Sequence, residues 1–278
     1  MPALDRLAER QLIVVTGKGG TGKTTLSAVL GRLLSLRGLR VLLLEVDPRE
    51  SLHQALGTEP SGGRVVEAGR GLCIQNLQPG AVIEALVREK VPIGYLAKLV
   101  TESPAFHTFI EGAPGLKETA LLGHAYRSLA GADTVIVDAP ATGHSAALLA
   151  APGLLAGAAR GGQLGAMAAE LAGFLADPNR CGAVLATLAE EMPVQETLEL
   201  IERLPVRPEL VVANMLFPRL PRGAAQGLWK ARRRLHEAEL ARLAAAWDGP
   251  LLELPMLALD RGPELVERLA SVFLEVDR

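Results

Sequence analysis

The sequence has little cysteine, few aromatic residues and few lysines. Its 278 residues include two cysteines, aromatic residues make up 3%, and six lysines stand against 23 arginines. Cys73 and Cys181 are far apart and form no C-x-x-C pair, which excludes a zinc ribbon. We expect each thiol to be a small core residue in a reducing compartment.

Long apolar runs and a strong charge excess are also missing. The most apolar stretch, 146–159, is short and is interrupted by Pro152, Gly153 and Gly157, so it predicts no membrane-spanning helix. Residues 1–11 are charged and do not read as a signal peptide. A net charge of −2 and a pI near 6.3 imply no bulk attraction to nucleic acid or anionic lipid. We expect a soluble, cytoplasmic protein without a nucleic-acid partner and without stable membrane insertion.

Strand and helix patterns alternate along the chain. Apolar runs predict strands at 12–15, 41–46, 72–77, 134–137, 183–188, 210–213 and 251–254. Helical spacing is found at 26–36, 193–204, 223–246 and 263–274. This alternation predicts an α/β fold with a doubly wound, mostly parallel sheet flanked by helices, in a single domain over residues 1–278.

The region 79–129 departs from this alternation. Its helical patterns are interrupted by Pro92, Pro104 and Pro114, where a minimal nucleotide-binding fold needs only a short crossover. We interpret it as a small helical insertion with a hinge around Gly112 and Gly115. Its apolar residues exceed what a surface crossover requires and include Val82, Ile83, Leu86, Val87, Ile93, Leu96, Leu99, Val100, Phe106, Phe109 and Ile110. They either pack on the sheet as ordinary core or form an apolar face that nucleotide exposes.

A phosphate-binding loop follows the first strand. Residues 17–24 read G-K-G-G-T-G-K-T between an apolar run and a helical pattern, the context that this motif requires. Its glycines let backbone N–H groups converge on phosphate oxygens at a helix N-terminus. Lys23 is expected to reach the β- and γ-phosphates, and Thr24 to ligate Mg²⁺. The predicted nucleotide-binding residues of the loop are Gly17, Gly19, Gly20, Thr21, Gly22, Lys23, Thr24 and Thr25.

Lys18 is a second cation at the loop entrance. The loop backbone turns away from its own nucleotide there, so Lys18 is better placed to contact the nucleotide of a second subunit. In that position it would stabilise charge that develops during phosphoryl transfer, as an arginine finger does. The alternative is a solvated loop lysine.

Two carboxylates end predicted strands. Asp138 is placed to hold Mg²⁺ through a water, or else it caps a helix. Asp47 is placed to orient the attacking water and to hold Mg²⁺ through a water, or else it too caps a helix. Gly143 lets the loop after Asp138 respond to the γ-phosphate, and His144 either reports nucleotide state or only packs. Glu45 has no assigned role.

These blocks resemble the ArsA family, within the MinD/ParA/ArsA class of ATPases whose phosphate loop reads K-G-G-x-G-K-T. The family's TDPAHS block is matched by residues 46–51 and its DTAPTGHT block by residues 138–145. The resemblance is nearest to bacterial Get-like members, whose APGLKE, VDAPPTG and LPVQETLE stretches are matched at 113–118, 137–143 and 192–199. It implies an ATP hydrolase with ATP and Mg²⁺ as cofactors, in which Lys18, Lys23 and Asp47 are catalytic.

The same resemblance implies the base site and the partners. Asn214, at the end of a predicted strand, would read the adenine edge, and Pro255 and Met256 would flank the base. An asparagine amide is suited to pairing with adenine N6 and N7. The implied assembly is a homodimer or a heterodimer with a paralogous ATPase.

The sequence also departs from specialised relatives. It lacks the C-x-x-C clamp and the long Met-rich insertion of the ATPase that targets tail-anchored proteins, and it has five methionines. It has one ATPase half and two isolated cysteines, unlike the arsenite pump subunit. The cellular role stays open between a nucleotide-gated dimeric switch with a protein client, a MinD/ParA-like positioning ATPase and a metalloid-efflux-linked ATPase.

Overall fold

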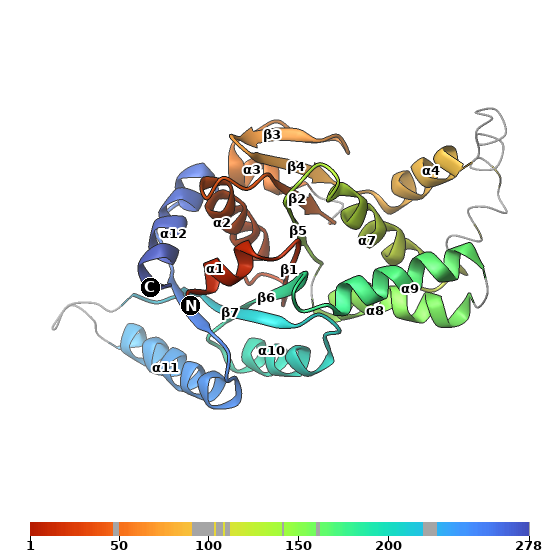
Figure 1. Cartoon of the computed structure of the whole chain (residues 1–278). Coiled ribbons are helices and arrows are strands. Elements are labelled where there is room, and N and C mark those ends of the chain that lie inside the picture. Colours follow the sequence, from red (N-terminus) through yellow and green to blue (C-terminus); the bar gives the residue numbers. More distant parts are fainter. Residues whose placement is uncertain are drawn as a thin grey trace.

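The computed structural model describes residues 1–46, 50–90, 103, 108, 112–140, 142–159, 162–218 and 227–277. Within these residues one sheet of eight strands has the order β3-β4-β2-β5-β1-β6-β7-β8 (Figure 1). The strands are β1 Leu12–Gly17, β2 Val41–Glu45, β3 Val66–Gly69, β4 Leu72–Asn76, β5 Thr134–Asp138, β6 Cys181–Leu188, β7 Pro208–Leu216 and β8 Leu251–Pro255. Every pairing is parallel except that of β3 with β4.

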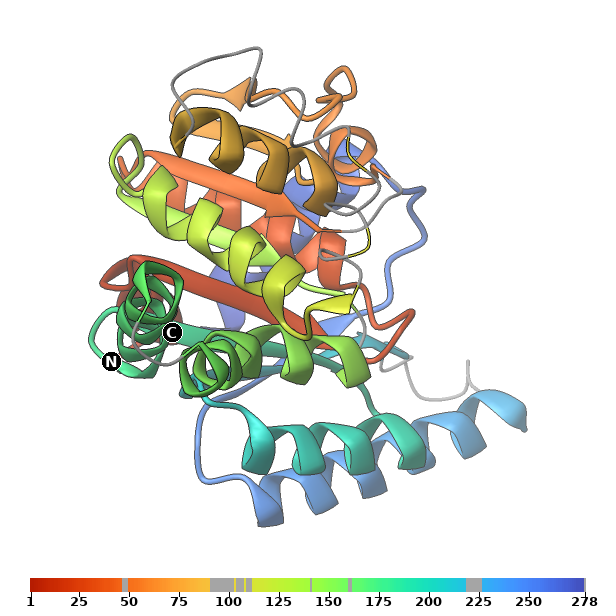
Figure 2. The same cartoon turned by 90° about the vertical axis from the view of Figure 1, so that its right-hand side faces the viewer.

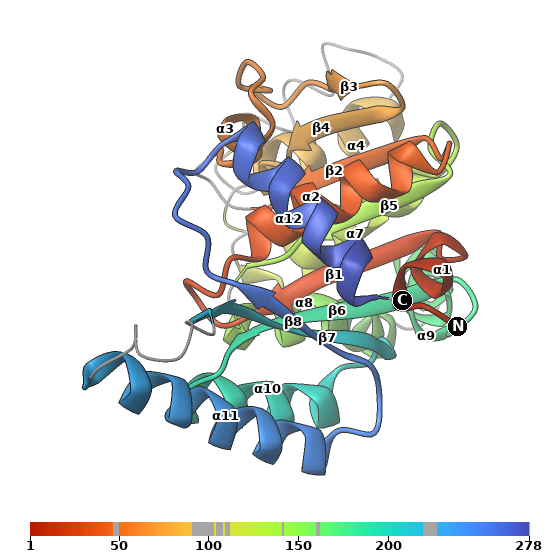
Figure 3. The same cartoon turned by 90° about the vertical axis from the view of Figure 1, so that its left-hand side faces the viewer.

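Helices cover both faces of this sheet. Figure 2 looks onto the face covered by α4, α7, α8, α9 and α10, and Figure 3 onto the face covered by α1, α2, α3 and α12. The outermost helix, α11, lies against α10. The bounds are α1 Ala3–Ala8, α2 Lys23–Leu36, α3 Leu52–Leu56, α4 Pro79–Lys90, α7 Leu116–Ser128, α8 Thr142–Ala158, α9 Gln163–Ala176, α10 Glu191–Arg203, α11 Leu228–Ala246 and α12 Pro263–Val276.

The period-2 geometry of the strands divides the core into two layers. In β1, Leu12 and Val14 face one buried cluster, while Ile13 and Val15 face the other. Because both faces are covered, the central strands are apolar on both faces over most of their length, as parallel strands in doubly wound folds are, and their polar residues lie mainly toward the strand ends. Phe273 of α12 and Phe174 of α9 are the large aromatic side chains of the two layers. The predicted doubly wound α/β architecture is confirmed.

The predicted strands are confirmed, and their bounds differ by a few residues at most. One strand was not predicted: β3 pairs with β4 in antiparallel register and carries a bulge between Glu67 and Gly69. Its residues are half-buried or exposed, so it has no apolar run from which to recognise it. Within the described residues, the predicted helix 223–246 corresponds to α11, which begins at Leu228. Residues 223–226 lie outside the described part of the chain.

The predicted insertion is described at its two ends, as α4 and α7. Val82 and Ile83 are buried, and Leu86 packs against the same core cluster. In this structure these three side chains are therefore part of the ordinary core and do not form an exposed apolar face. Val87 is half-buried, and the remaining residues of that predicted apolar set, from Ile93 to Ile110, lie outside the described residues. Gly115 caps α7 with a φ of 78° and sits against Ala151 of α8, which fixes where α7 meets α8.

The two ends of the described chain are tied together. The carboxylate of Asp277 accepts hydrogen bonds from the backbone N–H groups of Ala3 and Leu4, at 2.7 and 2.8 Å. These two N–H groups lie in the first turn of the short helix α1 and have no partner within that helix, so Asp277 satisfies them. Among the described helices, none is long and apolar enough to cross a bilayer.

Candidate functional site

The carboxyl ends of β1, β2 and β5 bring the predicted site residues to one edge of the sheet. β5 pairs with both neighbours, and its last residue, Asp138, lies opposite Val15 of β1 and Glu45 of β2. The loop 17–22 leaves β1 at this edge and enters α2. Ligands of doubly wound sheets bind at this edge, outside the carboxyl ends of the strands.

Glycine is required at two points of the loop. Gly17 has a φ of 145°, and a Cβ there would lie 2.0 Å from the carbonyl oxygen of Ala186 in β6. Gly22 has a φ of 86°, and a Cβ there would lie 2.4 Å from Nδ2 of Asn214. Both positions combine a left-handed backbone with close approach of another strand, which excludes any side chain.

The N-terminus of α2 is open. Gly22 is its N-cap and provides no side-chain hydrogen bond, so the first N–H groups, those of Lys23, Thr24 and Thr25, need another acceptor. The Lys23 ammonium donates to the carbonyl oxygen of Lys18 at 3.0 Å, which keeps it on the loop. An open helix N-terminus beside a lysine is suited to a polyphosphate.

Thr24 and Asp138 meet at the predicted metal position. The Thr24 hydroxyl donates to Oδ2 of Asp138 at 2.7 Å, and Asp138 is almost fully buried. The second carboxylate oxygen, Oδ1, accepts from the hydroxyl of Ser27 at 3.1 Å. A hydroxyl and a carboxylate side by side form a hard oxygen donor set of the kind that Mg²⁺ takes.

Asn214 contacts the phosphate loop directly. Its Nδ2 donates to the carbonyl oxygen of Thr21 at 2.9 Å, and its Oδ1 accepts from the N–H of Met215 at 2.9 Å. Met215 has a φ of 56°, unusual for a residue with a side chain. Beside it, the N–H of Met256 donates to the carbonyl oxygen of Leu216, which places the Pro255–Met256 segment next to the Asn214 strand end. The adenine contact of these residues stays a prediction.

Lys18 is held by its own chain. Its ammonium lies 2.5 Å from Oε1 of Glu196 on α10, and both side chains are about one-third exposed. Lys18 therefore points toward α10. No sequence pattern indicated this partner, although Glu196 lies within the family-like stretch 192–199.

Glu45 is a buried carboxylate, 2% exposed, at the end of β2. Its oxygens accept from the N–H groups of Ser51, at 2.7 and 3.0 Å, and of Leu52, at 3.4 Å, so it ties β2 to the start of α3. Burial raises its pKa to about 7; the backbone hydrogen bond from Ser51 opposes the shift, and the negative charge of Asp138 adds to it. Asp47, two residues on, lies outside the described residues.

This raised pKa predicts a pH dependence of stability. An unfolded glutamate ionises near its ordinary value of 4.5, whereas the folded protein favours neutral Glu45 up to about pH 7. Relative to Glu45→Gln, the wild type should therefore lose about 3 kcal/mol of unfolding free energy between pH 4.5 and pH 7. Urea unfolding in EDTA without nucleotide checks this, with exposed Glu264→Gln as the control variant. A pH-independent difference between wild type and Glu45→Gln would contradict it.

A buried hydroxyl pair joins β1 to α8. The Thr16 hydroxyl donates to the Ser145 hydroxyl at 2.6 Å, and neither side chain is exposed. Thr16 directly precedes the phosphate loop, and Ser145 ends the block that begins at Asp138. Thr16 and Ser27 were not among the predicted site residues. Ser27 follows Thr24 by three residues, a spacing that places both on one helix face and could have revealed it.

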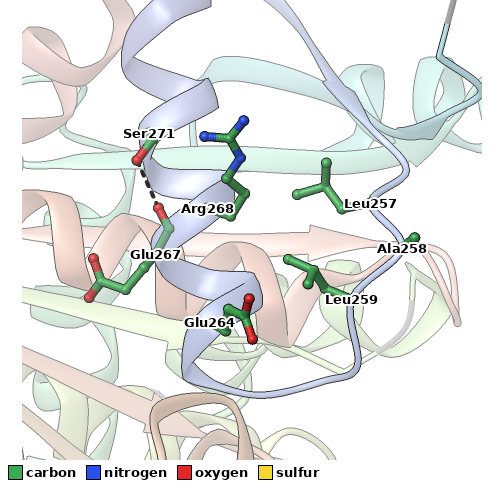
Figure 4. Close-up of a pocket in the computed structure, with 7 residues that line it drawn as sticks. All are labelled: Leu257, Ala258, Leu259, Glu264, Glu267, Arg268 and Ser271. Carbon is green, nitrogen blue, oxygen red and sulfur yellow. Dashed lines mark hydrogen bonds between the residues drawn. The ribbon is translucent and has the colours of Figure 1, made fainter.

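A pocket of about 540 Å³ opens between α12 and the segment that follows β8 (Figure 4). Leu257 and Leu259 line one side, and Glu264 and Arg268 of α12 line the other. Neither the phosphate loop nor Asp138 or Asn214 lines it. None of the residues predicted to bind the nucleotide lines this pocket.

Comparisons with known proteins agree with this geometry. The profile of the family described as anion-transporting ATPase, ArsA_ATPase, matches residues 10–160, which include the phosphate loop and Asp138. "ATPase BagA" of Mycobacterium tuberculosis is 32% identical over 229 residues, covering 77% of this chain and 66% of the relative. The chain thus spans just under two thirds of that relative's length.

More distant relatives carry names from the same family. "ATPase ASNA1 homolog 1" of Paramecium tetraurelia is 29% identical over 165 residues, or 55% of this chain and 48% of the relative. "Putative arsenical pump-driving ATPase 1" of Aquifex aeolicus is 28% identical over 153 residues, or 51% and 38%. Since the family profile covers more than half of the chain and includes its phosphate loop, the protein belongs to the ArsA family of ATPases.

Proposed function

We propose that this chain is a Mg²⁺-dependent ATPase that works as a nucleotide-gated dimer. The observation that carries the proposal is the Thr24–Asp138 contact at the open N-terminus of α2. There, the loop N–H groups and Lys23 bind the phosphates, and Thr24 and Asp138 hold the metal. Bound Mg²⁺ would neutralise charge on the transferred phosphoryl group. Asp47 orients the attacking water.

Lys18 is the residue that leads us to propose a dimer. In the single chain, its ammonium is paired with Glu196 on α10. We propose that ATP brings two copies, or this chain and a paralogous ATPase, face to face at the carboxyl edge. Lys18 then exchanges Glu196 for the partner's nucleotide. The exchange costs little in the resting state because a partly exposed ion pair is worth about 0–1 kcal/mol.

Metal-dependent turnover tests the enzyme assignment. We expect slow release of phosphate from ATP with Mg²⁺ and none in EDTA. Asp138→Asn should lower turnover at least about tenfold because it removes the anionic group at the metal position. Exposed Asp260→Asn serves as the matched control. Equal turnover of wild type and Asp138→Asn across a Mg²⁺ titration would contradict the proposal.

A protein client is favoured by one surface. The 31 residues of α8 and α9 contain one charged residue, Glu170. Three of their large apolar side chains are exposed: Leu154 at 68%, Met167 at 46% and Leu164 at 40%. The two helices pack against each other, and a pair of adjacent helices with little charge and several exposed apolar side chains is typical of a binding surface. It follows Asp138 in the chain and is tied to β1 by the Thr16–Ser145 bond, so nucleotide state has a short route to it. We propose that the protein works in a reducing cytoplasm, and the two free thiols of Cys73 and Cys181 support this location.

Hydrogen exchange tests the client proposal. We expect protection of residues 79–129 and 142–176 to differ between ADP and a non-hydrolysed ATP analogue, because the segment after Asp138 responds to the γ-phosphate. α12 serves as an internal reference on the opposite face of the sheet. Identical protection in both nucleotides would leave these helices as scaffold and the client without a mechanism.

A further inference from the structure

Asp138 is held by two hydroxyls of the same helix. Thr24 donates to Oδ2 at 2.7 Å, and Ser27, one turn further along α2, donates to Oδ1 at 3.1 Å. Ser27 has no exposed surface, and Asp138 is 5% exposed. The two donors engage both oxygens of the carboxylate, so rotation of Asp138 about its side-chain bonds would break at least one of these contacts.

The Ser27 contact is unusual for a serine inside a helix. Such a hydroxyl commonly bonds a carbonyl of its own helix. Ser35, two turns later on α2, does this: it donates to the carbonyl oxygen of Arg32 at 2.9 Å. Ser27 instead donates to a neighbouring strand, which ties α2 to the end of β5.

The carboxyl group next to Asp138 makes this contact consequential. Glu45 lies opposite Asp138 in the strand register, so two carboxyl groups are buried side by side and each needs its own hydrogen-bond donors. A hydrogen bond to the carboxylate from the α2 side opposes movement of Asp138 away from α2. Because Ser27 occupies Oδ1, the other carboxylate oxygen, Oδ2, is the one that lies beside Thr24 at the start of α2.

We propose that Ser27 is a positioning residue for the divalent cation: it fixes the Asp138 carboxylate beside the Thr24 hydroxyl, where Thr24 would hold the metal and Asp138 would hold it through a water. This inference rests on the proposed Mg²⁺ dependence. Groups that orient a metal-binding carboxylate typically change metal affinity by about 10–100-fold when removed. Ser27 is fully buried and its hydroxyl bonds Asp138, so nucleotide affinity without metal should not depend on it.

The test is metal binding, measured apart from turnover. Mn²⁺ affinity in the presence of ADP is measured by electron paramagnetic resonance for wild type, Ser27→Ala and the same-helix control Ser35→Ala. Ser27→Ala should weaken Mn²⁺ binding by about tenfold or more, with ADP affinity in EDTA unchanged. Ser35→Ala should match the wild type. The conservative Ser27→Thr, which keeps the hydroxyl, should restore most of the affinity.

The outcomes distinguish the positioning role of Ser27 from the proposed Mg²⁺-dependent function. Wild-type Mn²⁺ affinity in Ser27→Ala would overturn the positioning role and leave the proposed function intact. Absence of Mn²⁺ binding in the wild type would overturn both. If Ser27→Ala fails to fold, the comparison of Ser27→Thr with Ser27→Cys replaces it, because a thiol is the weaker donor. Weaker metal binding by the Cys variant supports the role, and equal binding overturns it.

Discussion

An equal mixture of Lys18→Ala and Lys23→Ala chains is expected to regain about a quarter of wild-type ATP turnover, although each variant alone is nearly inactive. Lys18→Ala keeps its phosphate-binding lysine but gives its partner no second cation. Lys23→Ala loses phosphate binding but still offers Lys18. In the mixed dimer, the Lys18→Ala subunit therefore has a complete site. Random pairing makes about half of the dimers mixed, and each has one working site of two.

The size of the single-variant defect follows from the role given to Lys18. A cation supplied to the transferring phosphoryl group from another subunit is worth about 10³–10⁵ in turnover in other phosphoryl-transfer enzymes. The ion pair with Glu196 shows that Lys18 has another partner when the chain is alone. The exposed lysine Lys230, on α11, provides the control: Lys230→Ala should retain wild-type turnover alone and in mixtures.

The turnover of the mixture can be interpreted only if mixed dimers are shown to form. Two affinity tags, one on each variant, allow the mixed species to be purified in the presence of Mg²⁺ and ATP. A purified mixed dimer with no more turnover than the Lys18→Ala homodimer would rule out action across the interface. Lys18 would then be a loop lysine whose partner is Glu196 alone.

Asp47→Asn is expected to bind ATP as tightly as the wild type and to lose about 10²–10⁴ of its turnover. An asparagine has nearly the shape of the aspartate but is a poor acceptor for a proton of the attacking water. Asp47 lies between Glu45 and Ser51, which are joined by the Glu45 carboxylate. The two ends of the segment that contains Asp47 are therefore anchored at the edge where Asp138 also lies.

Nucleotide binding and single-turnover hydrolysis separate the two effects of this substitution. Exposed Asp248→Asn, in the connection between α11 and β8, is the matched control. Turnover of Asp47→Asn within twofold of the wild type would remove Asp47 from the mechanism, and the capping alternative would then account for it. A loss of ATP binding equal to the loss of turnover would point to a role in the metal site instead.

The fold was predictable where burial is two-sided. The central strands are continuous apolar runs, because the layers above and below leave no polar face, and those runs were recognisable without any structure. The edge strand β3 has no such run, since Val66 and its neighbours are only partly covered. α9 was missed for the opposite reason: its residues are so uniformly apolar or small that they show little helical periodicity.

The site was predictable where chemistry depends on local spacing. The loop glycines, Lys23 and Thr24 are contiguous, and Asp138 ends an apolar run. Contacts between distant segments were not: Glu196 approaches Lys18 from 178 residues away and Asn214 approaches Thr21 from 193. Such pairs depend on strand order, and no local pattern specifies that β6 and β7 follow β1 across the sheet. Asp47 lies outside the described residues, and so does the side chain of His144, so their roles stay predictions.

Sedimentation velocity of the wild-type chain, in ADP and in a non-hydrolysed ATP analogue with Mg²⁺, tests the central claim most directly. The claim is that ATP and metal at the Thr24–Asp138 site bring two chains together so that Lys18 can leave Glu196. We predict a monomer in ADP and a dimer in the analogue, with the dimer abolished by EDTA. The same species in both nucleotides, at concentrations where turnover is measured, would contradict the nucleotide-gated dimer.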